Sequence, residues 1–197
     1  MSNSQFNEFE IIRELLPNID DGVYVDVGAG DPIKFSNTYD LYNLGWYGLC
    51  IDLQSQFVNE HRQKRPRDIC VCTALSNYVG TTEVFGGGHH CTIEKGYLKN
   101  TNVKVSVTTF DKVREQYEEL CAKCLLCSID VDYHEDKFFQ GMNLSLFHPK
   151  LFIVESVKKY KDGADAEELW ENKLFENDYK LIKISNIAIN YFYIKAY

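Results

Sequence analysis

A short apolar run that ends in a glycine turn is the feature that most constrains the fold of this chain. Residues 23–31 have the sequence VYVDVGAGD, in which an apolar segment leads directly into Gly28 and Gly30. Such continuous runs are typical of parallel strands that helices cover on both faces. Glycine lets the chain turn sharply and lets a ligand approach the backbone. The stretch predicts a first buried strand with a nucleotide-type ligand site at its end, or simply a tight strand-to-helix turn.

Apolar patterns over the rest of the chain predict further elements of the same architecture. More strands are expected at residues 46–52, 69–75, 125–130, 151–155, 179–184 and 187–194, and helices at residues 5–16, 32–45, 55–65, 110–124, 136–146 and 164–177. The two residues between the last two strands indicate a hairpin. We therefore expect one α/β domain over residues 1–197, with a three-layer, doubly wound, mostly parallel seven-stranded sheet and a C-terminal antiparallel hairpin.

Two β-branched segments, residues 81–85 and 103–109, lie outside this alternation and predict a separate pair of strands. Between them the chain contains three consecutive glycines, residues 86–88, which cannot hold regular structure without an entropic cost. This run predicts a flexible surface loop. The alternative is a mobile lid that presents His89 or His90 to the site.

The charge and composition of the chain argue against several classes of protein. A formal net charge of −8 over 197 residues disfavours nucleic acid or an anionic membrane surface as a partner. No apolar run approaches the roughly 20 residues that span a bilayer, so no membrane insertion is expected. The N-terminus has no signal-peptide pattern. With seven cysteines, an odd number, we expect reduced thiols and a cytoplasmic location.

Four of the predicted strands end in a carboxylate at the same edge of the sheet, and these are Asp26, Asp52, Asp130 and Glu155. A carboxylate at the end of the second strand is the usual grip on the hydroxyls of a nucleoside ribose. Each acid taken singly is also a plausible helix N-cap. Four such acids at the same edge of the sheet favour a ligand site.

The glycine turn discriminates between two cofactors. Sites for nicotinamide dinucleotides have a third glycine, where this chain has Ile33. Asp26 and Asp31 flank the turn and would repel a pyrophosphate, whereas a sulfonium cation with an ammonium group suits acidic surroundings. Pro32 is expected to begin the following helix. The residues favour S-adenosylmethionine, and a nicotinamide-dependent sugar-modifying enzyme is the alternative.

Several segments in order resemble the FkbM-type methyltransferase family. They are residues 25–31 (VDVGAGD), 35–38 (FSNT), 44–52 (LGWYGLCID), 128–135 (SIDVDYHE) and 149–155 (PKLFIVE). The resemblance implies a class I fold and an S-adenosylmethionine-dependent O-methyltransferase that modifies a hydroxyl of a sugar in a glycan or glycoconjugate. It also implies a small-molecule or glycan acceptor. The size of the chain is compatible with one domain of a larger glycan-modifying protein.

The resemblance also implies roles for individual residues. The cofactor would be bound by Asp26, Gly28, Ala29, Gly30, Ser36, Thr38, Asp52, Leu53, Ala74, Leu75 and Ser76. Among these, Ser36 and Thr38 would lie close to the cofactor carboxylate, and Asp130 would face the reacting centre. Tyr133 stands where the family has glycine, so it would narrow the acceptor pocket or stack on a sugar.

Methyl transfer to an alcohol requires removal of the hydroxyl proton. His134 directly follows the strand that ends in Asp130 and is a candidate general base, with Asp130 and Glu155 as further catalytic candidates. A structural histidine is the alternative for His134. Mg²⁺ or Mn²⁺ held by Asp130, Asp132 and Glu155 could instead acidify the hydroxyl. A non-catalytic module that only binds the cofactor is a further possibility.

Overall fold

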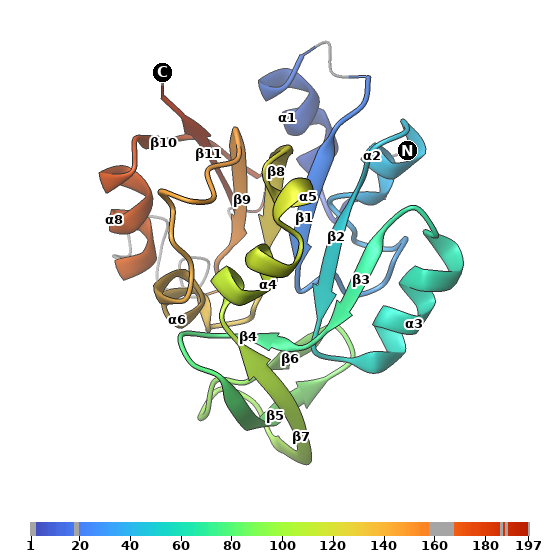
Figure 1. The fold of residues 1–197 in the computed structure, drawn as a ribbon, viewed down its shortest axis with the longest axis vertical. Coiled ribbons are helices and arrows are strands. Elements are labelled where there is room, and N and C mark those ends of the chain that lie inside the picture. Colours follow the sequence, from blue (N-terminus) through green and yellow to red (C-terminus); the bar gives the residue numbers. More distant parts are fainter. Residues whose placement is uncertain (1–2, 18–19, 158–167, 186, 188, 197) are drawn as a thin grey trace.

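The computed structural model describes residues 3–17, 20–157, 168–185, 187 and 189–196, and these form a mixed α/β structure (Figure 1). The strands are β1 (Val23–Val27), β2 (Tyr47–Asp52), β3 (Ile69–Cys72), β4 (Ala74–Leu75), β5 (Gly80–Gly87), β6 (His90–Thr92), β7 (Asn100–Thr108), β8 (Cys124–Ile129), β9 (Leu151–Glu155), β10 (Tyr179–Ile184) and β11 (Asn190–Lys195). The helices are α1 (Glu8–Leu15), α2 (Tyr39–Asn43), α3 (Ser55–Lys64), α4 (Phe110–Gln116), α5 (Glu118–Cys121), α6 (Glu135–Gln140) and α8 (Leu169–Glu176). None of these helices is long and apolar enough to cross a membrane.

A mostly parallel sheet of seven strands forms the centre of the structure, in the order β10-β11-β9-β8-β1-β2-β3. β1 pairs in parallel with β2 on one side and with β8 on the other. β11 runs antiparallel to both of its neighbours, β9 and β10. Because the chain continues in opposite directions on the two sides of β1, a crevice is expected where the carboxyl ends of β1 and β8 meet.

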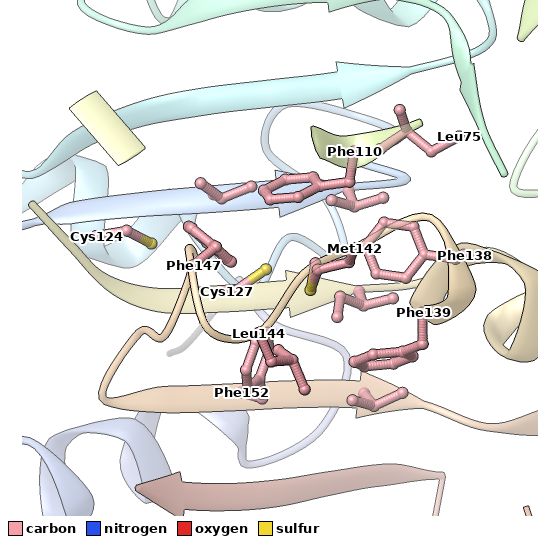
Figure 2. Close-up of a cluster of buried hydrophobic side chains, with 14 of the residues drawn as sticks. Leu75, Phe110, Cys124, Cys127, Phe138, Phe139, Met142, Leu144, Phe147 and Phe152 are labelled. Carbon is pink, nitrogen blue, oxygen red and sulfur yellow. The ribbon is translucent and has the colours of Figure 1, made fainter. Parts of the chain in front are cut away.

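Both faces of this sheet are buried, as the apolar strand sequences predict. On one face, side chains from α1, α2 and α3 pack on strand residues such as Tyr24 and Leu126. On the other face, α4, α6 and α8 cover Val25 and Cys127. Six buried aromatic rings on this face, including Phe139 and Phe152, pack against one another in edge and tilted contacts. Figure 2 shows part of this second cluster, with Phe110, Phe138 and Phe147 above the strands.

A second, four-stranded sheet in the order β4-β7-β5-β6 lies beyond the carboxyl ends of β1, β2 and β3 (Figure 1). The predicted pairing of residues 81–85 with 103–109 is confirmed, since β5 is antiparallel to β7. The glycine run does not form a simple loop. Gly86 and Gly87 belong to β5 and pair with β6, and only Gly88 and His89 form the turn between the two strands.

Two predicted elements are only partly confirmed. The helix expected over residues 32–45 is confined to α2, and Pro32 does not begin it. The amides of Ile33 and Lys34 donate to the Asp31 carboxylate as at a helix start, but Phe35 has a φ of 61°, which prevents the chain from continuing as a helix. The strand expected over residues 69–75 is divided between the two sheets, as β3 and β4.

Smaller differences concern element boundaries. The helix expected at residues 110–124 is two short helices, α4 and α5, and β8 already begins at Cys124. The helix expected at residues 136–146 is α6, which ends at Gln140. β11 begins at Asn190, three residues later than predicted. The first residues of the helix expected at 164–177 lie outside the described part of the chain.

Candidate functional site

A cavity of about 360 Å³ opens at the carboxyl ends of β1, β2, β8 and β9, in the size range of small-ligand sites. The structure brings together most of the residues that the sequence singled out. Those lining the cavity are Asp26, Gly28, Ala29, Gly30, Asp52, Leu53, Ala74, Leu75, Asp130, Asp132, His134 and Glu155. Three predicted residues, Ser36, Thr38 and Ser76, are buried behind the lining.

The glycine turn is shaped by a close approach of two strand ends. Gly28 has a φ of 72°, and a Cβ at this position would lie 1.7 Å from the carbonyl oxygen of Asp130. The amide of Asp130 in turn donates to the carbonyl of Val27 at 2.9 Å. Only glycine fits here, and the contact fixes the ends of β1 and β8 side by side at the cavity.

Asp52, at the end of β2, is tied to the same turn. One carboxylate oxygen accepts from the amide of Gly30 at 2.9 Å, and the other accepts from the amide of Gln54 at 2.7 Å. Burial raises the pKa of Asp52, although both amide hydrogen bonds act to lower it. Each carboxylate oxygen has two acceptor positions, so Asp52 can still accept a ligand hydroxyl.

Asp26 lies on the floor of the cavity and is only 5% exposed. Burial raises its pKa to about 6, although the charge of Arg65 and the hydroxyl of Thr38 act to lower it. The Thr38 hydroxyl donates to Asp26 at 2.5 Å. Thr38 therefore orients an acid of the cavity from behind.

A fully buried guanidinium organises the layer behind Asp26. Arg65 donates from Nε to Asp68 at 2.7 Å and from Nη2 to the hydroxyls of Tyr24 and Thr38 at 2.6 and 2.9 Å. It also donates to Ser36 at 3.2 Å. Ser36 and Thr38 thus belong to a structural network, and they do not form the cavity wall that the resemblance implies.

Three acids at the ends of β8 and β9 interact electrostatically, and they are Asp130, Asp132 and Glu155. Burial raises the pKa of Asp130 well above its usual range, and the charges of Glu155 and Asp132 add to this. Burial likewise raises the pKa of Glu155, and Asp132 and Glu8 contribute. The pKa of Glu155 is raised to about 8, so this group exchanges a proton near neutral pH, and the pKa of Asp130 shifts in the same direction.

Asp130, Asp132 and Glu155 are not among the described residues whose potential ligand atoms cluster closely, and the metal site expected there stays a prediction. In the part of the chain that the structure describes, one group of three potential ligands has atoms within 4.8 Å of one another, and it is Cys50, His61 and Asp68. Asp68 of this group is already bound by Arg65 at 2.7 Å, and a cation beside that guanidinium would be repelled.

His134 is enclosed and has partners on both sides. Its Nδ1 lies 2.8 Å from a carboxylate oxygen of Glu94, and its Nε2 lies 2.9 Å from the hydroxyl of Ser76. The pKa of His134 is lowered by burial, although Glu94 acts to raise it. A neutral ring whose Nδ1–H donates to Glu94 and whose Nε2 accepts from Ser76 has no nitrogen left for a substrate. This geometry supports the structural alternative for His134.

The turn between β5 and β6 closes over the cavity. The ring of His89 stacks on Phe57 with centroids 5.5 Å apart, and the Gly88 carbonyl accepts from the side chain of Gln54 at 2.8 Å. On the other side, the amide of Cys91 donates to Asp132 at 3.0 Å. His89 and His90 both line the cavity, as the lid alternative predicts.

Tyr133 is not part of the cavity lining. It has a φ of 69°, and its ring stacks on Tyr97 with centroids 4.1 Å apart and an interplanar angle of 9°. The expectation that it narrows the acceptor pocket is therefore not met. Tyr97 is 56% exposed, so the pair forms an aromatic surface outside the cavity.

Glu8, Glu94 and Asn190 are among the residues at the site that sequence reasoning missed. Asn190 lines the cavity from β11, and its amide donates to the buried carboxylate of Glu8 at 3.0 Å. These residues lie far from the glycine turn in sequence and belong to no motif, so only the fold brings them to the site. A comparison of the sequence with models of known protein families and with curated proteins finds no match.

Proposed function

We propose that this protein is an S-adenosylmethionine-dependent methyltransferase of the class I fold that methylates a hydroxyl group, with a sugar as the expected acceptor. The observation that carries the proposal is the cavity at the ends of β1, β2 and β8, whose charged lining is mostly acidic. The order of the large sheet and the reversed strand β11 at its C-terminal part support the fold. A three-layer, doubly wound architecture is in keeping with the helices on both faces.

The turn after β1 favours this cofactor over a nicotinamide dinucleotide. A pyrophosphate is usually held by the N-terminus of the helix that follows the glycine turn. Here Asp31 holds a non-helical turn, and the next helix, α2, begins only at Tyr39. The acids Asp26 and Asp52 line the cavity and suit a ligand with a sulfonium and an ammonium group, and we assign to Asp52 the role of accepting from a ribose hydroxyl.

The chemistry that the bound cofactor supplies is a methyl group on a positively charged sulfur, which leaves as a neutral thioether. The residues of the chain have to position the acceptor oxygen and remove its proton. Asp130 and Glu155 suit this task because burial raises the pKa of both and the charge of Glu155 adds to the shift of Asp130, so the ionised member of the pair is a stronger base than an ordinary carboxylate. We assign the general base to this pair and a positioning role to His134.

Calorimetric titration with S-adenosylhomocysteine and with NAD⁺ tests the proposal. We expect S-adenosylhomocysteine to bind and NAD⁺ not to bind. Asp52→Asn should weaken the first by about 1–3 kcal/mol, the cost of a lost hydrogen bond to a charged group. Asp21→Asn, an exposed site before β1, is the matched control and should leave the affinity unchanged. Binding of NAD⁺ alone would overturn the proposal in favour of a nicotinamide-dependent enzyme.

A further inference from the structure

One end of the cavity consists of hydrogen-bond acceptors. We call it the acceptor corner and define it by Asp130, Asp132, Glu155 and Asn190, all of which line the cavity. Glu155 and Asn190 are directly paired residues of β9 and β11. Asp130 and Asp132 follow β8; the charge of Asp132 acts on Glu155, and the charges of Glu155 and Asp132 act on Asp130. The corner therefore gathers side chains from three strands that are neighbours in the sheet.

The amide of Asn190 has a fixed orientation. Its Nδ2 donates to a carboxylate oxygen of Glu8 at 3.0 Å, and the other oxygen of Glu8 accepts from the amide of Phe6 at 2.7 Å. Because a carboxylate can only accept hydrogen bonds, Glu8 holds the NH₂ group of the Asn190 amide on its own side. The carbonyl oxygen must then point the other way.

The carbonyl oxygen of Asn190 lacks a hydrogen-bond partner among the described residues, although the side chain is only 1% exposed. Leaving such a buried acceptor unpaired is costly, by about 1–3 kcal/mol. Asn190 also lines the cavity, which is where a donor on a ligand could supply the missing partner.

The charge of the cavity also favours a ligand that brings hydrogen-bond donors, in particular a positively charged one. Six carboxylates line it, and Lys34 is the one lysine or arginine among the lining residues that the structure describes. The six are Asp26, Asp31, Asp52, Asp130, Asp132 and Glu155. S-adenosylmethionine adds one net positive charge, so acidic side chains still outnumber positive charges in the cavity when it is bound. A second cation would lower the free energy of the ionised acids in the corner, which burial and mutual repulsion raise.

We propose that the acceptor corner recognises a protonated amine on the molecule that is methylated, so that the acceptor is an amino alcohol such as an amino sugar. An ammonium group brings three donors and a positive charge, and the corner offers the Asn190 carbonyl and carboxylates as acceptors. The inference rests on the proposed methyltransferase function for its account of the rest of the cavity. Glu8 serves as a positioning residue, since it turns the Asn190 carbonyl toward the ligand.

A matched pair of small probes tests this inference: 2-aminocyclohexanol and cyclohexane-1,2-diol, which differ in one amine. Calorimetry with protein saturated with S-adenosylhomocysteine should give at least tenfold tighter binding of the amine, a difference of about 1.4 kcal/mol. Glu155→Gln and Asn190→Leu should remove most of this preference. Glu8→Gln should do so as well, because a glutamine can donate and so lets the Asn190 amide turn over. Asp21→Asn should keep the preference.

Three results would overturn the inference. They are equal binding of the two probes, no binding of the amine, and Mg²⁺ binding that abolishes the advantage of the amine. The pair is also measured without S-adenosylhomocysteine, and S-adenosylhomocysteine is titrated separately. Failure of S-adenosylhomocysteine to bind counts against the methyltransferase, whereas failure of the amine counts only against the acceptor corner.

Discussion

Replacing Asp26 by asparagine should stabilise the ligand-free protein at neutral pH. Burial raises the pKa of Asp26 from 3.8 to about 6, and this net shift already includes the opposing effects of Arg65 and Thr38. A difference of about 2 pKa units corresponds to about 3 kcal/mol at 1.36 kcal/mol per unit, an upper limit for the cost of keeping the carboxylate ionised in the fold. Asparagine avoids this cost and can still accept from Thr38.

The pH dependence of this gain has a definite sign. A carboxyl group whose folded-state pKa is raised destabilises the fold as pH rises from the unfolded pKa to the folded one. Below about pH 4 the group is neutral in both states, so Asp26→Asn should change little. Above about pH 6 the gain should be complete. Urea unfolding of the ligand-free protein at about pH 4 and about pH 7.5 measures both ends of the window.

Asp31→Asn is the matched control, because it makes the same chemical change in the same turn. Burial acts to raise the pKa of Asp31, but the amides of Lys34 and Ile33 outweigh it and lower the pKa. This substitution should therefore cost stability at neutral pH, by less than about 1 kcal/mol because the group is partly solvated. The reasoning is refuted if Asp26→Asn lowers stability at neutral pH, or if its effect is the same at both pH values.

Two further substitutions test the packing around the site by urea unfolding. Gly28→Ala should lower the free energy of unfolding by at least about 2 kcal/mol, because its Cβ would lie 1.7 Å from the carbonyl oxygen of Asp130 and its φ is 72°. Gly87→Ala is the control: the space around its Cβ is open, so the free energy of unfolding should change by no more than about 0.5 kcal/mol. Arg65→Met should cost about 3–5 kcal/mol by leaving the Asp68 carboxylate buried without its cation, and adding Asp68→Asn should recover part of this loss; no recovery would contradict the assigned ion pair.

The amino-acid sequence by itself determines much of the framework. Apolar runs such as Val23–Val27 and Leu151–Glu155 specify buried parallel strands, because a strand covered on both faces has no need for polar alternation. The acids at the ends of these strands must then lie at one edge of the sheet. This logic alone brings Asp26, Asp52, Asp130 and Glu155 to one cavity.

Only the tertiary structure decides which side chains are available there. The sequence predicts Thr38 and Ser76 as cofactor-binding residues. In the structure, however, their hydroxyl groups bind Asp26 and His134 and do not line the cavity. Local sequence patterns did not predict the left-handed φ of 61° at Phe35 that interrupts the helix expected from Pro32. Asn190 reaches the cavity because β11 pairs with β9, and Glu8 fixes its amide from 182 residues away. Such long-range hydrogen bonds depend on how the elements pack, and local sequence patterns record only periodicity along the chain.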